Sequence, residues 1–544
     1  MPLNYPTLPG DVDHLVADDH AVVERQFEHF EAGRGDRRVL ADQICFNISL
    51  HADAEERTFY PELKRIDRAG DANHLIGEHQ EVKELVKIVE KEDPGSEAFE
   101  QAMTAIIADI RKHLVEEEVE FLPELRAAVG PQRMGELGLE FIAAKRTAPT
   151  YSHPAAPSSG SGHKLLDAGA ALVDKVRDKG SGRVKGLATD PSGLLDPQAQ
   201  RILDTFSAMG PQPLEILKPE QARKQPTLPD AVMAILKEDG KSTDPEPVGS
   251  VRDVVIEGPG GDLSVRIYSP ASADGVALPV LLWVHGGGWV LYTVDTYDAS
   301  CRGLVNKTGA IVVSPEYRRA PEAVFPASHD DVLATYRWIA AHAAEFGGDP
   351  SRIAVGGESV GATMAAATSL QVMGAGEPMP VAQVLVYPLT TPEQYGDSMQ
   401  EEADARPLNR LLLNWMALHA FEGVPERAAD PRVDLLSLSD EQLSGLPPTL
   451  VITDERDPLR SQGEKFAQNL AAAGVTTQHV RYDGVMHEFF GAAAVLDKAE
   501  QAQLRAASHV LTAFGISRPP AMSTSSPGAH VGAESRSDDA ALPQ

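Results

Sequence analysis

The sequence predicts a multidomain protein, in which an N-terminal all-α four-helix bundle precedes an α/β domain with a mostly parallel, doubly wound sheet and a helical cap. Two observations predict this division. Up to about residue 145, apolar residues recur at steps of three and four and glycines are few, which is typical of long amphipathic helices. After residue 194, short apolar runs alternate with helical segments, which indicates parallel strands joined by crossover helices.

Composition narrows the classes of function. The 544 residues exceed the size of one ordinary domain, and a hydrophobic content of 42% supplies enough apolar surface for folded cores. The formal charge of -31 disfavours nucleic acid and anionic membranes as partners. Two distant cysteines, Cys45 and Cys301, predict neither a disulfide scaffold nor a thiolate metal site. With no signal peptide and no apolar run long enough to span a membrane, we expect a cytoplasmic protein, and a homo-oligomer remains open.

Changes in composition set the expected boundaries. Pro, Ser and Gly gather after residue 146, around one amphipathic patch at Leu165–Val176, and this texture is typical of a linker. The last residues are again rich in Ser, Pro, Gly and Ala, which predicts a disordered tail. We therefore expect a bundle at 1–145, a linker at 146–193, a cap at 194–250, an α/β domain at 251–516 and a tail at 517–544. Expected strands lie at 279–284, 310–313, 352–355, 384–386, 449–453 and 478–482.

In the N-terminal region, each of the four predicted helices carries one histidine on its apolar stripe. The stripes are Val16, His20, Val23, Phe27, Phe30; Leu40, Ile44, Ile48, His51, Glu55, Phe59; Leu75, His79, Val82, Val86, Val89; and Met103, Ile106, Ile110, His113, Glu117, Phe121. In the second and fourth helices a glutamate follows the histidine one turn later. His14, His29 and His74 fall off these stripes, and we expect them at the surface.

One histidine on an apolar face is usually a hydrogen-bonded core residue, but four with two glutamates indicate a different role. Two carboxylates buried in a bundle core need positive charge, and the stripes contain no Lys or Arg. Bound metal supplies that charge. Four imidazoles and two carboxylates able to bridge suit two iron or manganese ions, and zinc is chemically possible.

Around these residues, over about 9–130, the chain resembles the hemerythrin-like (HHE cation-binding) family. The matching motifs are Asp19-His20, His51-x-x-x-Glu55 before Phe59-Tyr60-Pro61, Glu78-His79, and His113-x-x-x-Glu117 before Phe121-Leu122-Pro123. The resemblance implies a non-haem di-iron site with the ligands His20, His51, Glu55, His79, His113 and Glu117. Leu75 stands where oxygen-carrying members have a further histidine, so binding or sensing of O2 or NO, reaction with peroxide and iron handling all remain open. Tyr60 is either a hydrogen-bond donor to the site or an interface residue.

The α/β region contains a strand, sharp turn and helix around Gly357-Glu358-Ser359-Val360-Gly361. This Gly-x-Ser-x-Gly pattern is typical of a nucleophile elbow, in which small neighbours allow the strand and the helix to approach. The pattern alone is weak, but a glycine turn at His285–Trp289 follows an upstream strand and could direct backbone amides at an oxyanion. Together the two motifs predict nucleophilic catalysis by Ser359.

A catalytic serine also needs a base and an acid, which follow it in the order acid, then histidine. Asp457 and Asp454 both follow a predicted strand, and His487 follows the next one. Ligands bind at the carboxyl ends of strands in open α/β sheets. His487 is thus the expected base, while the two aspartates compete as its partner.

Over about 194–516 these motifs resemble the hormone-sensitive-lipase-like branch of the α/β-hydrolases. The matches are the sequences at 285–289, 317–322, 325–327, 357–361 and 457–460, together with His487. The resemblance implies Ser359 as nucleophile, His487 as base, Asp457 as its orienter, and the amides of Gly286, Gly287 and Val360 as the oxyanion hole. Glu358, Val360, Ala362 and Arg319 replace residues more common in that branch.

The sequence therefore predicts an esterase that needs no cofactor for small or medium carboxylic esters, fused to a domain with two non-haem iron ions that senses or reacts with O2, NO or peroxide. Manganese and zinc are alternatives to iron. Two other readings remain: an iron- or O2-binding sensor in which the hydrolase fold is a binding platform, and a di-iron peroxidase with an accessory esterase. Whether the two domains are coupled stays open at this point.

Overall fold

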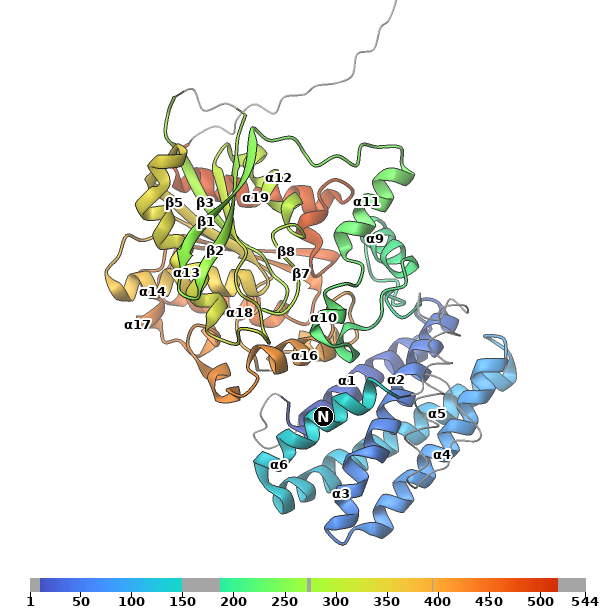
Figure 1. Cartoon of the computed structure of the whole chain (residues 1–544). Helices are drawn as coiled ribbons and strands as arrows, with labels where there is room; N and C mark the ends of the chain where they lie inside the picture. The colour runs from blue at the N-terminus through green and yellow to red at the C-terminus, as the bar shows by residue number, and fades with distance from the viewer. Residues whose placement is uncertain (1–9, 149–185, 272–274, 394, 517–544) are drawn as a thin grey trace, which may run out of the picture.

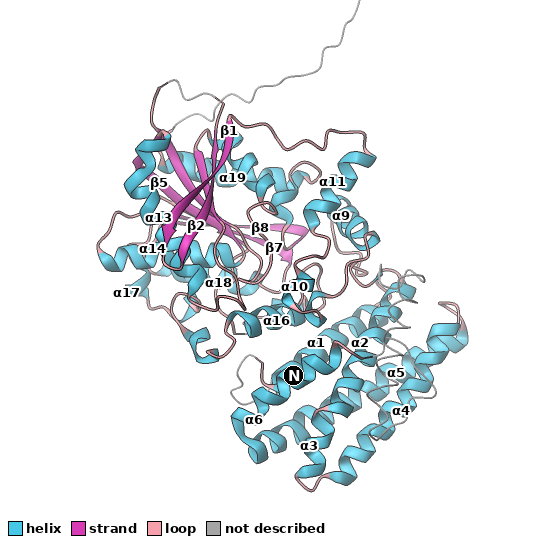
Figure 2. Cartoon of the chain, in the orientation of Figure 1, coloured by secondary structure: helices cyan, strands magenta, loops and turns pink. Residues whose placement is uncertain are grey.

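The computed structural model describes residues 10–148, 186–271, 275–393 and 395–516. These residues form a helical N-terminal region beside an α/β domain, and Figure 2 shows all the strands in the second of the two. The predicted fold class is therefore confirmed. The expected linker helix at Leu165–Val176 and the expected tail at 517–544 lie outside the described residues.

The bundle is built from four long helices and two additions. The long helices are α1 (Val12–Glu31), α2 (Arg37–Arg57), α4 (Ala69–Lys91) and α5 (Glu97–Glu116). The additions are α3 (Phe59–Arg65) and α6 (Leu122–Lys145), and α6 packs on α1 and α2. Between α5 and α6 the chain forms a π-helical turn, η1 (Glu117–Phe121), which begins at a predicted ligand.

The second helix ends earlier than the stripe ending at Phe59 predicts. It stops at Arg57, and Thr58, with φ -125° and ψ -65°, separates it from α3. Proline has no amide hydrogen and its ring clashes with the carbonyl four residues earlier. Pro61 would meet the carbonyl of Arg57 in this way, so the break falls where the proline requires it.

A sheet of eight strands forms the centre of the α/β domain, in the order β1-β2-β4-β3-β5-β6-β7-β8. The strands are β1 (Ser250–Gly258), β2 (Gly261–Ser269), β3 (Leu278–Val284), β4 (Ile311–Pro315), β5 (Gly348–Glu358), β6 (Gln383–Val386), β7 (Thr449–Arg456) and β8 (Thr477–Met486). The pairs β1–β2 and β2–β4 are antiparallel. All the other neighbouring pairs, from β4–β3 through to β7–β8, are parallel. The hairpin of β1 and β2 was not among the expected strands.

Helices cover both faces of this sheet (Figure 1). One core joins it to α13 (Ala327–His342), α14 (Val360–Ala375) and α18 (Arg460–Ala472). The core of the other face includes α12 (Asp298–Thr308) and α19 (Asp497–Ala513), and α9 (Pro197–Ala208) and α11 (Leu228–Glu238) join it from the cap. The short α10 (Pro219–Ala222), α15 (Ser398–Glu401) and α17 (Asp440–Leu443) lie in connections.

The two regions meet along α1, which packs against α16 (Arg410–Ala420) of the α/β domain (Figure 1). Asp18 of α1 forms an ion pair with Arg410, and both side chains are buried. His29 is also buried here, with its Nε2 3.6 Å from Asp404 Oδ1, so its expected surface position is wrong. Its face of α1 is covered by the second domain rather than by water. His74, in contrast, is exposed.

Among the helices of the described ranges, none combines the length and the apolarity needed to cross a lipid bilayer.

Candidate functional site

The elbow around Ser359 lies between the end of β5 and the start of α14. Ser359 has φ 56° and ψ -126°, a left-handed conformation that costs a non-glycine residue free energy and is found mainly at functional sites. Its glycine neighbours are required. A Cβ on Gly357 would lie 2.5 Å from the Val284 carbonyl oxygen, and one on Gly361 would lie 2.1 Å from it. The local sequence therefore permits a turn that presents the serine at the carboxyl end of the central strand β5.

His487 follows β8 and is held by Asp457, which follows β7. The Nδ1 of His487 donates a hydrogen bond of 2.7 Å to Asp457 Oδ2, and both side chains are buried. Burial alone would lower the pKa of His487, but the Asp457 carboxylate beside it raises this pKa above its usual value. Asp457 Oδ1 also accepts the amide of Leu459 at 2.8 Å, which fixes the carboxylate. The structure thus pairs the imidazole with Asp457 rather than with Asp454.

Asp454, the competing acid, is buried behind this pair. Burial and the nearby Asp457 raise the pKa of Asp454 well above its usual range. The surroundings of Asp454 therefore disfavour its charged form.

The glycine turn after β3 brings backbone amides close to Ser359. A Cβ on Gly286 would lie 3.1 Å from the Ser359 Cβ, and Gly287 has φ 101°. Val360 is the first residue of α14, so its amide has no carbonyl partner within the helix. The glycine turn and the first residue of α14 thus lie next to Ser359, as the predicted oxyanion hole of Gly286, Gly287 and Val360 requires.

Tyr317 supports this turn, although the sequence motif alone assigns no role to it. Its hydroxyl donates to the carbonyls of His285 at 3.1 Å and Gly286 at 2.9 Å, and its ring stacks on His285 with centroids 4.1 Å apart. Burial lowers the pKa of His285 to about 3, so this histidine is neutral and structural. The tyrosine opens the motif at 317–322, but nothing in that motif indicates which backbone it holds.

Glu358, one of the departures from the common pattern, points into the protein. Its carboxylate accepts hydrogen bonds from Trp283 Nε1 at 3.0 Å and from the hydroxyl of Tyr387. Tyr387 also packs against His487, with ring centroids 4.5 Å apart. Through Tyr387, Glu358 therefore connects the elbow to the ring that packs against His487.

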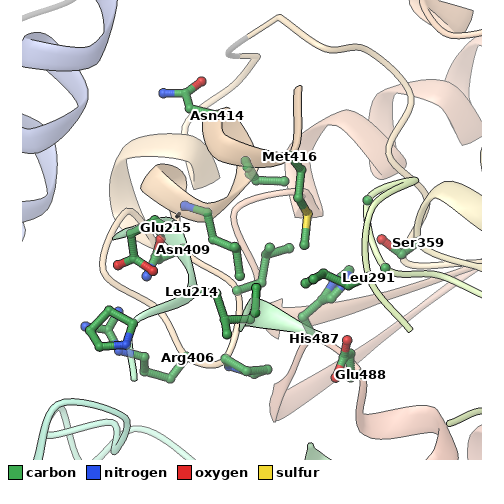
Figure 3. Close-up of a pocket in the computed structure, with 18 of the residues that line it drawn as sticks. Leu214, Glu215, Leu291, Ser359, Arg406, Asn409, Asn414, Met416, His487 and Glu488 are labelled. Carbon is green, nitrogen blue, oxygen red and sulfur yellow. Dashed lines mark hydrogen bonds between the residues drawn. The ribbon is translucent and has the colours of Figure 1, made fainter. Parts of the chain in front are cut away.

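A cavity of about 200 Å³ opens in front of Ser359 and His487. Leu214, Leu291 and Met416 contribute apolar surface to it. In Figure 3, Ser359 lies on one side of this cavity, and Glu215, Arg406 and Asn409 lie on the other. The cavity wall thus combines apolar side chains with several polar ones that lie farther from the serine.

The second candidate site lies in the bundle, where the predicted ligands converge as two histidine pairs. His20 Nε2 and His51 Nε2 are 3.1 Å apart, and His79 Nε2 and His113 Nε2 are also 3.1 Å apart. Two nitrogens that bind one ion at about 2.1 Å and at right angles lie about 3 Å apart. All four side chains are buried. Each pair therefore has the spacing of ligands that share a cation.

Glu55 and Glu117 lie between the two histidine pairs. Glu55 has one oxygen 3.1 Å from His51 Nε2 and the other 3.6 Å from His79 Nε2. Glu117 has one oxygen 3.4 Å from His20 Nε2 and the other 3.4 Å from His113 Nε2. Glu55 Oε1 and Glu117 Oε2 are buried and accept no hydrogen bond from the described residues. Such oxygens are costly without a cation, so the donor set fits bound metal.

An outer ring of four carboxylates orients these imidazoles. Each ligand histidine has one carboxylate on its Nδ1: Glu118 on His20 at 2.9 Å, Asp19 on His51 at 3.0 Å, Glu56 on His79 at 3.1 Å and Glu78 on His113 at 2.9 Å. Such partners fix the ring and raise its basicity as a ligand. The four acids were not predicted as a set, although each is adjacent in sequence to a predicted ligand.

The hydroxyl of Tyr60 lies inside the cluster. It is 2.9 Å from Glu117 Oε1 and 3.2 Å from Glu55 Oε2, and it lies 3.1 Å from His79 Nε2. Burial and the Glu117 carboxylate raise the pKa of Tyr60 well above its usual value, so the hydroxyl keeps its proton. Tyr60 is therefore a hydrogen-bond donor to the carboxylates rather than only an interface residue.

Comparison with protein families gives two matches. Residues 281–491 match the model of an alpha/beta hydrolase fold family, and residues 11–125 match a hemerythrin HHE cation binding domain. Each of the two ranges contains the residues of one candidate site.

Similar proteins are esterases. The chain is 38% identical to Esterase LipI of Mycobacterium tuberculosis over 47% of this chain and 79% of that protein. It is 32% identical to an ethyl acetate hydrolase of Pseudomonas putida over 53% of this chain and 88% of that protein. Among solved structures, an esterase of Pyrobaculum calidifontis is 33% identical with a TM-score of 0.53, and the match covers 59% of this chain and 100% of that one. A thermostable esterase of Pseudomonas putida is 32% identical with a TM-score of 0.54, over 59% and 98% of the two chains.

Proposed function

Because the chain belongs to the α/β-hydrolase fold family of carboxylesterases and carries a hemerythrin HHE cation-binding domain, we propose that Ser359, His487 and Asp457 form the triad of its esterase activity. The observation that carries the proposal is the left-handed backbone of Ser359 beside a cavity that His487 also lines. The hydrogen bond from His487 to Asp457 supplies the rest of the triad.

In this mechanism His487 Nε2 takes the proton from Ser359 Oγ as the oxygen attacks the ester carbonyl. The amides of Gly286, Gly287 and Val360 stabilise the oxyanion of the tetrahedral intermediate. The intermediate collapses to an acyl-enzyme, and the leaving alcohol takes the proton from His487. Water then attacks the acyl group, with His487 again as base, and releases the carboxylic acid and Ser359. Asp457 holds the imidazole and stabilises its charged form throughout.

We assign residues 194–250 to a cap over the acyl pocket. Leu214 and Glu215 of this segment line the cavity, and Arg223 Nε donates to the Val290 carbonyl at 2.8 Å. Arg223 also pairs with Glu322. These contacts attach the cap to the edge of the active site, which favours small or medium esters over large insoluble lipids.

For the bundle we propose two non-haem iron ions held by His20, His51, Glu55, His79, His113 and Glu117. Iron bound there would supply redox chemistry toward O2, NO or peroxide. The residues of this chain orient the ligands through the outer carboxylates, and Tyr60 supplies a proton donor beside Glu55 and Glu117. The two unpartnered carboxylate oxygens support a cation of higher charge than the surrounding side chains provide.

Hydrolysis of p-nitrophenyl butyrate by Ser359→Ala tests the triad. We expect kcat to fall by at least about 10³-fold, because the nucleophile is removed while the fold remains. Ser351→Ala, at an exposed serine, serves as the matched control and should retain the wild-type rate. Equal rates for Ser359→Ala and the wild type would exclude the proposed nucleophile.

Metal analysis of the purified full-length protein tests the bundle. We expect two iron ions per chain and their loss when Glu55 and Glu117 are both replaced by glutamine. A folded wild-type protein that binds no iron when ferrous iron is supplied would contradict the assignment, and binding of manganese or zinc alone would replace iron with that metal.

A further inference from the structure

Helix α2 presents two different buried faces. One face carries Ile44, Ile48, His51 and Glu55 toward the centre of the bundle. The other carries Gln43, Phe46, Asn47 and Leu50, which follow one another at steps of three, one and three. Such spacing places the second set along one side of the helix. Phe46 is 5% exposed and Gln43 is 1% exposed, although neither side chain belongs to the bundle core.

The second face of α2 packs against the segment that leads into the cap. Phe46 and Leu50 form a small apolar cluster with Leu187. Gln43 Nε2 donates to the carbonyls of Gly186 at 2.8 Å and Thr189 at 3.2 Å. From the other domain, Arg406 Nε donates to the Leu187 carbonyl at 2.9 Å. The segment 186–189 is thus held between the bundle and the α/β domain.

The cavity in front of Ser359 extends to this face of α2. Gln43, Phe46 and Asn47 line the same cavity as Ser359 and His487. Arg406 and Asn409 lie across the cavity from Ser359 in Figure 3 and line the part that is remote from the nucleophile. The cavity volume of about 200 Å³ is below the range of about 300 to 1,000 Å³ common for sites of drug-sized ligands. Its size is therefore sensitive to one aromatic side chain in the wall.

We propose that α2 of the metal-binding bundle forms the distal wall of the ester pocket, and that Phe46 limits the length of the ester chain that fits. The inference rests on the proposed hydrolysis at Ser359. The substrate class is a medium-length ester whose apolar chain passes Leu291 and Met416 and ends at Phe46. The bundle is then a specificity-determining part of the esterase and not only an attached domain.

Chain-length profiles of the full-length enzyme test this assignment. The rates measured are kcat/KM for p-nitrophenyl acetate, butyrate, octanoate and decanoate. Phe46→Ala removes the ring and should raise the ratio of decanoate to butyrate by about tenfold, since single methylenes in such pockets change kcat/KM by about 10- to 200-fold. Phe46→Trp enlarges the wall and should lower the same ratio. Phe99→Ala, in the bundle core away from the α/β domain, controls for loosening of the bundle.

The proposal would be supported if the decanoate-to-butyrate ratio of kcat/KM moved in opposite directions in the two Phe46 variants and stayed unchanged in Phe99→Ala. Three superimposable profiles would overturn it, as would the same shift in Phe99→Ala and Phe46→Ala. If Phe46→Ala does not fold, Phe46→Trp and Asn47→Leu carry the test, because each fills the pocket and should lower the ratio. Equal rates of the wild type and Ser359→Ala would instead refute the proposed hydrolysis, so the two failures are distinguishable.

Discussion

The α/β domain fixes its candidate active site largely through the backbone, whereas the bundle fixes its candidate metal site through side chains alone. Ser359 is presented by a left-handed turn, and the amides of Gly286 and Gly287 come from a glycine turn. In the bundle, six side chains converge from regular helices and a π-helical turn, and a second carboxylate holds each histidine.

The two sites also differ in how their buried charges are balanced. At the esterase site, His487 and Asp457 form a hydrogen-bonded pair, and the environment of Asp454 disfavours its charged form. In the bundle, the buried carboxylates of Glu55 and Glu117 face imidazoles and the hydroxyl of Tyr60, and a bound cation would balance their charge. We therefore expect the first site to be complete within this chain and the second to depend on what it binds.

The largest expected effect separates the two aspartates at the end of β7. Asp457→Asn should lower kcat for short esters by about 10⁴-fold, because the imidazole loses the carboxylate that fixes its tautomer and stabilises its charge. Asp454→Asn should retain nearly the wild-type kcat, since His487 is hydrogen-bonded to Asp457 and burial disfavours the charged form of Asp454. Steady-state kinetics of both variants check the prediction. An equal loss in the two variants would show that both carboxyls share the role.

The contiguous motifs explain why a candidate esterase site could be proposed from the sequence. The elbow and the glycine turn are local backbone features that need particular residues at adjacent positions. Tyr317 was missed because its contact with the Gly286 carbonyl spans 31 positions of the chain and depends on the sheet order. Residue spacing alone left Asp454 and Asp457 as competing acids, the family resemblance favoured Asp457, and in the structure Asp457 is the one hydrogen-bonded to His487.

In the bundle, only those features could be predicted that depend on which side chains share one face of a helix. Period and residue type indicate the ligand stripes, but they show neither the helix break at Thr58, which follows from Pro61, nor the π-helical turn at Glu117. The second faces of α1 and α2 could not be predicted either. His29 and Phe46 look like surface residues on their own helix, and they are buried because another domain covers them.

The next largest effect concerns the contact between the two regions. Asp18→Asn should lower the free energy of unfolding by about 3 kcal/mol, because Arg410 would keep its buried charge without its carboxylate partner. Denaturant unfolding of the full chain measures this change. The double variant Asp18→Leu with Arg410→Met should regain most of the loss. An unchanged stability of Asp18→Asn would mean that the buried pair does not hold the domains together.

The outer carboxylates of the bundle should have a smaller effect, confined to the metal. Glu56→Gln should weaken metal binding by about 10- to 100-fold, since His79 would lose the carboxylate that orients it. Competition with a coloured chelator measures the affinity. Glu84→Gln, at an exposed acid of the same bundle, is the matched control. An unchanged affinity of Glu56→Gln would show that helix packing alone positions the imidazole.

The smallest expected effect is a shift in the pH dependence of the esterase, which should depend on the α/β domain and not on the bundle. His487 must be neutral to accept the serine proton, and Asp457 raises its pKa in spite of burial. Activity should therefore be full at higher pH and fall as the pH decreases through a midpoint above the usual value of about 6.5. Asp457→Asn should move the midpoint of the residual activity to lower pH, because the stabilising carboxylate is gone. Chelation of the bundle metal should leave the midpoint of the wild type in place, since the titrating group lies in the other domain. A midpoint below 6.5 would contradict the raised pKa of His487, and a midpoint that moves on chelation would contradict the independence of the two regions.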